Sequence, residues 1–244
     1  MKMPVLYIQN KSTLITDANV ALMVKACQKQ LSQHVAPLLG RRTWRLKMLS
    51  GSAVVPEGEM QIIVMDDADQ AGALGYHTQD PQGNPWGRVF VNPVTKSGGT
   101  WFSGALSVSV VLSHEVIETF MDSSVNLWAD MTDGEHEVAY EFCDPVEADA
   151  YEIDVTSKDG VVHHISVSNF VTEHWFDAYA TNEKLDYMDR TPGPLKMSKG
   201  GYMVVYEYSS NKVTNVFGSS EAEAHHNKIK PAHSASRAAK RLNT

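Results

Sequence analysis

One apolar stretch, residues 112–122, most restricts how this chain can fold. It reads Leu-Ser-His-Glu-Val-Ile-Glu-Thr-Phe-Met-Asp, and two further valines precede it. Apolar or small residues recur at helical spacing at Leu106, Val110, Ser113 and Ile117. This pattern predicts a long helix over residues 103–121. Because the flanks are strongly apolar, we expect the helix to be buried, and its buried polar side chains then need partners.

Three residues of this predicted helix form a His-Glu-x-x-Glu pattern. His114 and Glu118 lie one helical turn apart on the same face, and Glu115 lies about 100° round the helix. Imidazole and carboxylate groups both bind metal ions. The spacing predicts His114 and Glu118 as metal ligands, with Glu115 as a catalytic base that activates a metal-bound water. Asp122 falls on nearly the same face, as an alternative ligand, a partner of His114 or the end of the helix.

A third ligand is expected from a later segment, since catalytic metal sites usually have three protein ligands and one open position. The acidic run at residues 141–147 is the richest source. Glu141 is the first choice, 23 residues after Glu118. Asp144 lies one helical turn from Glu141 if this segment is helical. It is then either a residue that orients a ligand or the third ligand itself, and the sequence leaves this open.

These residues together resemble the zincin metallopeptidases, over about residues 88–147. The resemblance rests on an edge-strand-like segment at residues 89–91, the His114 helix, and the later Glu141 with Asp144. It is closest to the branch whose third ligand is a glutamate on a separate helix. It implies zinc (Zn²⁺) bound by His114 and Glu141, Glu115 as the base, and a peptide or protein substrate. The combination is also similar to uncharacterised bacterial and phage proteins.

Glu118 stands where that family has a second histidine. One histidine and two carboxylates formally neutralise a dipositive ion, which makes the ion a poorer Lewis acid than two histidines would. Harder ions such as manganese, calcium or iron compete better with zinc at such a site. The alternative is that no metal binds, and that the polar face of the helix pairs with protein groups.

The remaining pattern predicts an α+β fold rather than a parallel doubly wound sheet, because strands and helices are partly segregated. We expect a zincin-like core, which is a mixed sheet with an edge strand plus the long His114 helix, followed by C-terminal β-hairpins. The expected strands cover residues 5–9, 44–49, 60–65, 75–77, 88–92 and 125–131, and a first helix covers residues 18–36. The hairpins pair residues 151–155 with 161–167 and 202–208 with 213–217. Residues 1–217 form one domain in this interpretation, and residues 218–244 form an extended basic tail.

Charge is unevenly distributed along the chain. The net charge is -8, yet the segment from His225 onward holds five basic residues and no acidic one. An acidic body argues against specific nucleic-acid binding. The basic tail predicts contact with a partner, another copy of the chain or an anionic surface, unless it is solvated and disordered.

The sequence lacks the patterns that are typical of several other classes of protein. No stretch reaches the roughly 20 apolar residues of a membrane span, and residues 1–5 carry no signal-peptide pattern. We therefore expect a soluble protein, made in the cytoplasm and without membrane partners. Cys27 and Cys143 form no Cys-x-x-Cys pair, which excludes a thiolate zinc cluster. No phosphate-binding glycine loop and no serine-hydrolase Gly-x-Ser-x-Gly motif is present.

Two hypotheses follow from these patterns. The first is a metal-dependent, peptidase-like hydrolase in which Glu115 activates the metal-bound water. The second is a non-catalytic structural or assembly protein, for example a phage virion component, in which a zincin-like scaffold carries a structural or relic metal site. In the second hypothesis the basic tail joins a homo-oligomer or a larger protein assembly, such as a virion.

Overall fold

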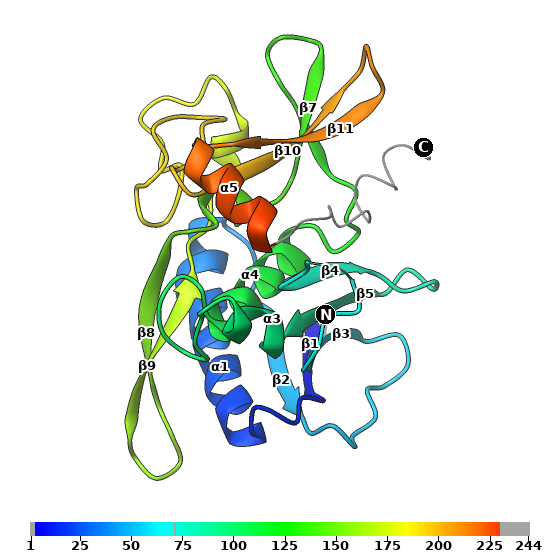
Figure 1. The fold of residues 1–244 in the computed structure, drawn as a ribbon, viewed down its shortest axis with the longest axis vertical. Coiled ribbons are helices and arrows are strands. Elements are labelled where there is room, and N and C mark those ends of the chain that lie inside the picture. Colours follow the sequence, from blue (N-terminus) through cyan, green and yellow to red (C-terminus); the bar gives the residue numbers. More distant parts are fainter. Residues whose placement is uncertain (1–2, 71, 230–244) are drawn as a thin grey trace.

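The computed structural model describes residues 3–70 and 72–229, and its base is a five-stranded mixed sheet (Figure 1). The strand order is β2-β1-β3-β5-β4. The strands are β1 (Val5–Asn10), β2 (Arg45–Leu49), β3 (Met60–Met65), β4 (Gly75–Gln79) and β5 (Pro85–Phe90). Four of them run parallel, and the edge strand β4 pairs antiparallel with β5. The expected mixed sheet is therefore present, but its edge strand is β4, whereas residues 89–91, expected at the edge, end the interior strand β5 and begin the next helix.

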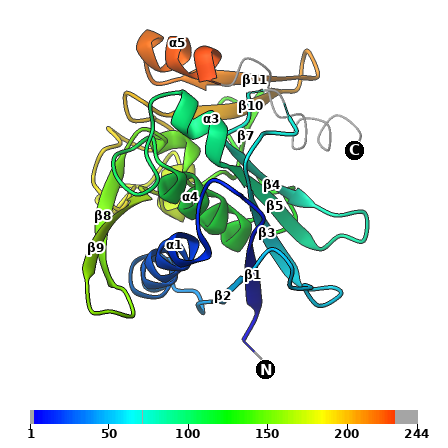
Figure 2. The same ribbon diagram turned by 60° about the horizontal axis from the view of Figure 1, so that its bottom comes forward.

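Two helices cover one face of this sheet and are covered in turn by a hairpin (Figure 2). The helices are α1 (Asp17–Gln30) and α4 (Val108–Met121), and the hairpin consists of β8 (Ala150–Thr156) and β9 (Val162–Ser168). Helix α4 lies in the middle layer, and all 14 of its residues are buried. Most of its apolar residues join the main core, while its polar residues are buried as well.

Helix α1 begins where the sequence predicts, because the Thr16 side chain accepts a hydrogen bond from the Asn19 amide. Its last part is irregular. A π-helical turn, η1 (Leu31–Val35), leads into the short α2 (Ala36–Leu38), which contains Pro37. Proline has no amide hydrogen and its ring clashes with the carbonyl of the preceding turn, so the regular hydrogen-bond pattern is interrupted there.

Helix α4 begins later than the predicted residue 103. Its N-cap is Ser107, whose side chain accepts from the Val110 amide. Before it, Thr100 and Ser103 exchange hydrogen bonds that hold a local turn. Gly104 follows with a φ of 83°, which an α-helix does not allow. The short helix α3 (Val91–Lys96) lies between β5 and this loop.

A smaller antiparallel sheet forms the second part of the fold, with the order β11-β10-β7-β6. Its strands are β6 (Trp128–Asp130), β7 (His136–Ala139), β10 (Tyr202–Glu207) and β11 (Lys212–Phe217). Both predicted hairpins, β8–β9 and β10–β11, are present. Strand β6 is shorter than predicted, because the Asp122 carboxylate binds the backbone amides of Asn126 and Leu127 and holds them in a loop.

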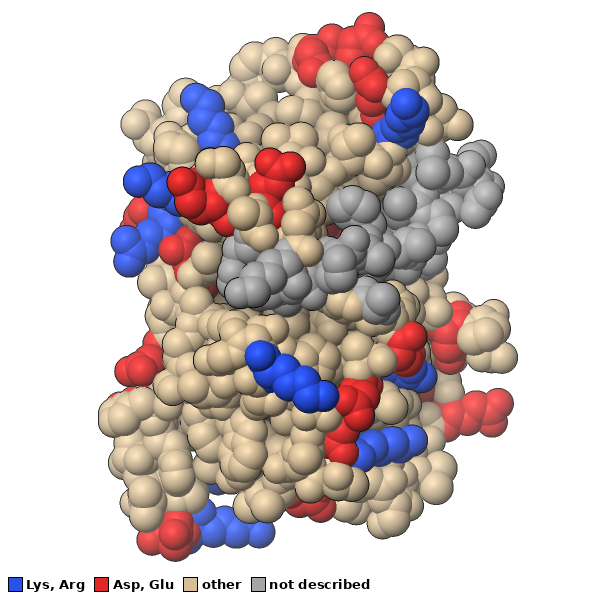
Figure 3. Space-filling model, viewed as in Figure 1, with Lys and Arg blue, Asp and Glu red and all other residues tan. Residues whose placement is uncertain are grey.

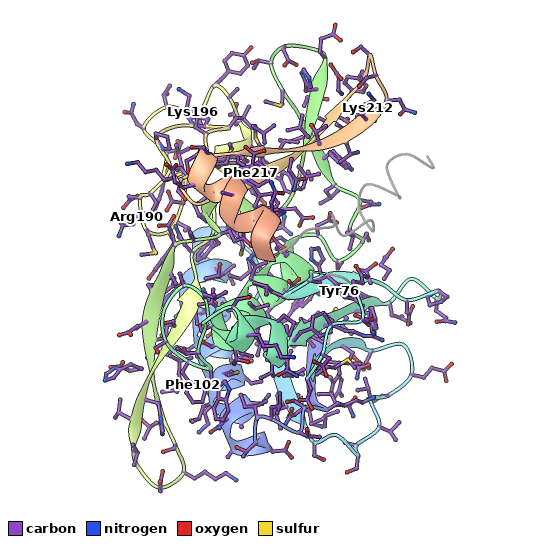
Figure 4. All side chains as sticks on the ribbon, viewed as in Figure 1. Tyr76, Phe102, Arg190, Lys196, Lys212 and Phe217 are labelled. Atoms are coloured by element: carbon purple, nitrogen blue, oxygen red, sulfur yellow. The ribbon has the colours of Figure 1, made fainter. Side chains whose placement is uncertain are left out.

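Residues after Gly218 were expected to be an extended tail, but helix α5 (Ser220–Ile229) forms there and lies across the smaller sheet (Figure 1). Its His226 is buried and contacts the rings of Tyr202 and Phe217, the latter labelled in Figure 4. This aromatic packing explains why the segment folds. Most of the predicted basic tail, residues 230–244, lies outside the described residues.

The acidic segment after β7 is not the helix that the sequence analysis expected. The Tyr140 amide bonds to the carbonyl of Leu127, and the Phe142 carbonyl accepts from the Val171 amide. These tertiary bonds hold the backbone extended. Only a short 3-10 turn, η2 (Asp144–Val146), follows, and it contains Pro145. A second 3-10 turn, η3 (Glu173–Phe176), supports the same region.

The surface shows no dominant charge on the face drawn in Figure 3, where acidic and basic side chains are interspersed. Among the described residues, no helix has both the length and the apolar character that crossing a membrane requires.

Candidate metal centre

The edge strand β4 crosses α4 at a glycine. A side-chain β-carbon at Gly75 would lie 2.7 Å from Glu115 Oε1 and 2.7 Å from Val111 Cγ1. The strand can approach the helix this closely because glycine has no β-carbon. Tyr76 points to the opposite face of the sheet, where it packs near Phe90. Strand alternation then turns the next residue, His77, back toward α4.

His77 is the residue that the sequence analysis missed. Its Nδ1 lies 3.4 Å from Glu115 Oε2 and 3.3 Å from Glu118 Oε2, and its Nε2 lies 3.7 Å from Glu141 Oε2. The available signal was the Gly-x-His pattern in the strand expected at residues 75–77. That pattern places a histidine on the same face as a glycine that makes room for a neighbouring element.

His114 forms a second group with two carboxylates. Its Nε2 lies 3.1 Å from Glu118 Oε2, as the helical spacing predicts, and 3.2 Å from Asp144 Oδ1. Asp144 reaches His114 from the turn η2. Glu141, the first choice for the third ligand, instead lies beside His77, while Asp144 occupies the place next to His114.

Glu118 connects the two groups and anchors the later segment. The same oxygen, Oε2, faces both histidines, while Oε1 accepts a hydrogen bond of 3.2 Å from the Cys143 amide. The six side chains are buried, each at most 9% exposed: His77, His114, Glu115, Glu118, Glu141 and Asp144. We call them the histidine–carboxylate cluster. Three separate parts of the fold, β4, α4 and the segment after β7, supply its members.

The electrostatics of the cluster are dominated by its carboxylates. Burial alone would lower the pKa of His77, but the negative charge of Glu141 and the adjacent carboxylates of Glu115 and Glu118 raise it to about 10. The pKa of His114 is likewise raised well above its ordinary value, against burial, mainly by Glu118. Burial would raise the pKa of Glu118, yet the two histidines hold it below its ordinary value. The cluster therefore attracts positive charge strongly.

The donor set fits a divalent cation. His77, Glu115 and Glu118 each offer a ligand atom within 4.8 Å of the others, and so do His114, Glu118 and Cys143. Two buried atoms, His77 Nε2 and Glu115 Oε2, have no hydrogen-bond partner among the described residues. Buried polar atoms without partners are costly, and a bound cation would satisfy Glu115 Oε2.

Two other predicted or neighbouring residues have structural roles. Asp122 uses one carboxylate oxygen for the backbone amides of the loop after α4, at 2.9 Å each. This bond accounts for its burial without a metal ion. Cys143 is fully buried, and burial raises the pKa of its thiol well above the ordinary value. The thiol form is a weak ligand, so the carboxylates dominate the cluster chemistry.

A cavity of about 270 Å³ opens onto one side of the cluster, at His114 and Glu115. Much of its wall is apolar, from Leu74, Leu106, Val110 and Val111. Helix α5 completes it with His226. Behind this wall Tyr202 is buried, and burial together with the charge of Asp144 raises the pKa of its hydroxyl well above the ordinary value. The cavity is large enough for one side chain of a ligand and offers it an apolar surface.

These elements define a mixed α/β protein with a buried histidine–carboxylate cluster beside an apolar cavity. Comparisons of the chain with protein-family models, with curated proteins and with solved structures found no match in any of the three. Its function is therefore inferred from the cluster and the cavity.

Proposed function

We propose that the protein is a metal-dependent hydrolase of peptides, with the ion held by His114, Glu118 and Asp144. The observation that carries the proposal is the position of His114. Its Nε2 lies within 3.2 Å of both carboxylates, and the residue also borders the cavity together with Glu115. The proposed ligands, a candidate base and space for a substrate are therefore found together around His114. Asp144 replaces Glu141 as the proposed third ligand because of its distance to His114.

The fold supports a zincin-like core for this proposal. A mixed sheet with an edge strand and a buried helix carrying His114, Glu115 and Glu118 are features that the resemblance implies, although the edge strand is β4 and not residues 89–91. The third ligand differs from the one that the resemblance implies. The carboxylate of Asp144 lies on a 3-10 turn after an extended segment and not on a separate helix. The support comes from this architecture and not from a matched relative.

The proposed chemistry assigns proton transfer to Glu115. A bound divalent ion would act as a Lewis acid, which polarises a carbonyl group and acidifies water. Glu115 takes the proton from the attacking water and passes it to the leaving amine. Its Oε2 lies 3.4 Å from His77 Nδ1, so His77 orients the carboxylate. The ligand carboxylates of Glu118 and Asp144 favour harder ions, and manganese is expected to compete with zinc.

The cavity indicates the kind of substrate. Its apolar wall adjoins Glu115 and His114, so a bound peptide would place an apolar side chain there, next to the bond that is cleaved. Burial of such a side chain stabilises binding by about 1.5–3 kcal/mol. We therefore expect cleavage beside aliphatic or aromatic residues rather than beside charged ones.

Metal content and hydrolysis test the proposal together. Purified protein is loaded with zinc or manganese, its metal is measured by mass spectrometry, and fluorescently labelled casein is the substrate. Glu115→Gln should retain the ion at His114 and lose about 10²–10⁴-fold in rate, which is the usual contribution of a general base. Glu152→Gln, exposed on β8, is the matched control and should behave like wild type. Undiminished hydrolysis by Glu115→Gln would refute the mechanism.

One observation favours a second candidate, a non-catalytic structural site. Glu118 Oε1 already joins α4 to the segment after β7 through the Cys143 amide, and an ion at His114 and Asp144 would tie the same two parts. Such an ion would act as a staple in a structural or assembly protein. Chelation that lowers the melting temperature, in a protein that cleaves no casein with any metal, would favour this function.

A further inference from the structure

We propose that the histidine–carboxylate cluster holds a second divalent cation, at His77, Glu115 and Glu118, with Glu118 bridging it to the ion at His114. This inference rests on the proposed function only in assuming that a first ion binds at His114. The position itself follows from contacts of His77, which belongs to the edge strand and not to the helix pattern.

The geometry provides two ligand groups that share one carboxylate. Glu118 Oε2 is 3.1 Å from His114 Nε2 and 3.3 Å from His77 Nδ1. Glu115 Oε2 faces the same His77 nitrogen at 3.4 Å, and the three ligand atoms of the second group lie within 4.8 Å of one another. A carboxylate can bridge two ions, and the ions of two-metal sites lie about 3.5–4 Å apart.

The unsatisfied buried oxygen is the independent sign of a ligand. Glu115 is 5% exposed, and its Oε2 has no hydrogen-bond partner among the described residues although it lies 3.4 Å from His77 Nδ1. An ion between these three residues would bind this oxygen directly. The cost of burying it without a partner would then be removed.

Charge balance also favours two ions over one. Glu115, Glu118, Glu141 and Asp144 carry four negative charges when ionised, and neutral His77 and His114 carry none. Two dipositive ions neutralise this set, whereas one ion at His114 beside a protonated His77 leaves one buried negative charge uncompensated. The second ion therefore completes the electrostatic balance of the cluster.

The two ring nitrogens of His77 have different roles: one binds the second ion and the other faces a supporting carboxylate. Nδ1 faces Glu115 and Glu118, while Nε2 faces Glu141 Oε2 at 3.7 Å. A carboxylate behind a ligating histidine fixes the tautomer and raises the basicity of the ligand. This assigns Glu141 as a positioning residue for His77. An ion at the second position would also take Glu115 as a ligand, so metal loading and proton transfer compete for this carboxylate.

Manganese binding to the chelator-stripped, full-length protein tests the inference. Titration followed by mass spectrometry should find two equivalents in wild type and one in His77→Ala. His164→Ala, an exposed histidine paired with Asp154 on the hairpin, is the matched control and should keep two. Electron paramagnetic resonance of wild type should show exchange-coupled Mn²⁺ pairs, a signal that needs no variant to fold.

The outcomes separate the two proposals. One equivalent in both wild type and His77→Ala, with no coupled signal, would overturn the second position and leave the ion at His114 intact. Loss of one equivalent in His114→Ala then identifies the first position. A wild-type protein that binds no manganese and no zinc would overturn both proposals.

Discussion

Replacing Gly75 with alanine tests how β4 and α4 together form the candidate site. The new β-carbon would lie 2.7 Å from both Glu115 Oε1 and Val111 Cγ1, and 3.1 Å from the Arg88 carbonyl oxygen. Ordinary contacts between such atoms are about 3.5–4 Å, so a displacement of about 1 Å is required. The end of the Glu115 side chain is the softest of the three neighbours, because the other two belong to packed elements.

The magnitude follows from this overlap. Overpacking of this kind costs about 1–3 kcal/mol. For a chain of this size each kcal/mol lowers the melting temperature by about 2–4 °C, so Gly75→Ala should melt roughly 2–12 °C below wild type. Moving Glu115 by about 1 Å should also weaken the second manganese equivalent by about 10–100-fold, the range seen when the residues that support a metal site are disturbed.

Scanning calorimetry and manganese titration measure the two effects. The matched control is Gly193→Ala, where the nearest heavy atom is Lys196 Cδ at 3.6 Å and no strain is expected. The reasoning would be refuted if Gly75→Ala had the melting temperature and manganese affinity of this control. A lower melting temperature with normal metal binding would mean that the helix, and not Glu115, absorbs the overlap.

Three further predictions concern stability. Ser113→Ala removes the Oγ that accepts from the buried Ser168 amide at 2.7 Å, and urea denaturation should show a loss of about 1–3 kcal/mol. The pKa of Asp186 is held below its ordinary value, against burial, by hydrogen bonds from Asn169, Thr191 and Arg190, so its contribution is present above about pH 4 and is lost as pH falls through the lowered pKa. Urea denaturation between pH 3 and 7 should therefore show a steeper acid loss in wild type than in Asp186→Asn. Adding a divalent ion at 100 times its dissociation constant should stabilise the fold by about 2.7 kcal/mol and raise the melting temperature by roughly 5–11 °C, and a chelator should reverse this shift in calorimetry.

The elements predictable from sequence were those with strong local signals. Strand β3 has the predicted bounds, and helix α1 begins within one residue of its predicted start. The predictions failed where tertiary contacts decide the backbone. Local spacing makes Glu141 and Asp144 look like neighbours on a helix, but bonds from Leu127 and Val171 hold that segment extended. A single sequence contains no signal for such distant pairings.

The candidate site divides in the same way. Helical spacing is sufficient to pair His114 with Glu118, and the structure brings them together. The choice between Glu141 and Asp144 depends on how the segment after β7 crosses α4, which local pattern does not encode. Predicting that His77 belongs to the site would have required knowing both that β4 is the edge strand and that β4 lies against α4. The sequence gives only a weak signal for either fact, and the two are combined only in the folded structure.

The origin of the cluster in three distant segments has a consequence for the order in which the protein matures. Of the ligands proposed for each ion, only two share a segment, His114 with Glu118 for the first and Glu115 with Glu118 for the second, so the unfolded polypeptide offers either ion a two-ligand chelate at most. His77 precedes His114 by 37 residues and Asp144 follows it by 30, and closing those loops costs entropy before any ion is gained. Tight metallation therefore has to follow folding, and the ion would select the finished fold instead of directing the chain toward it.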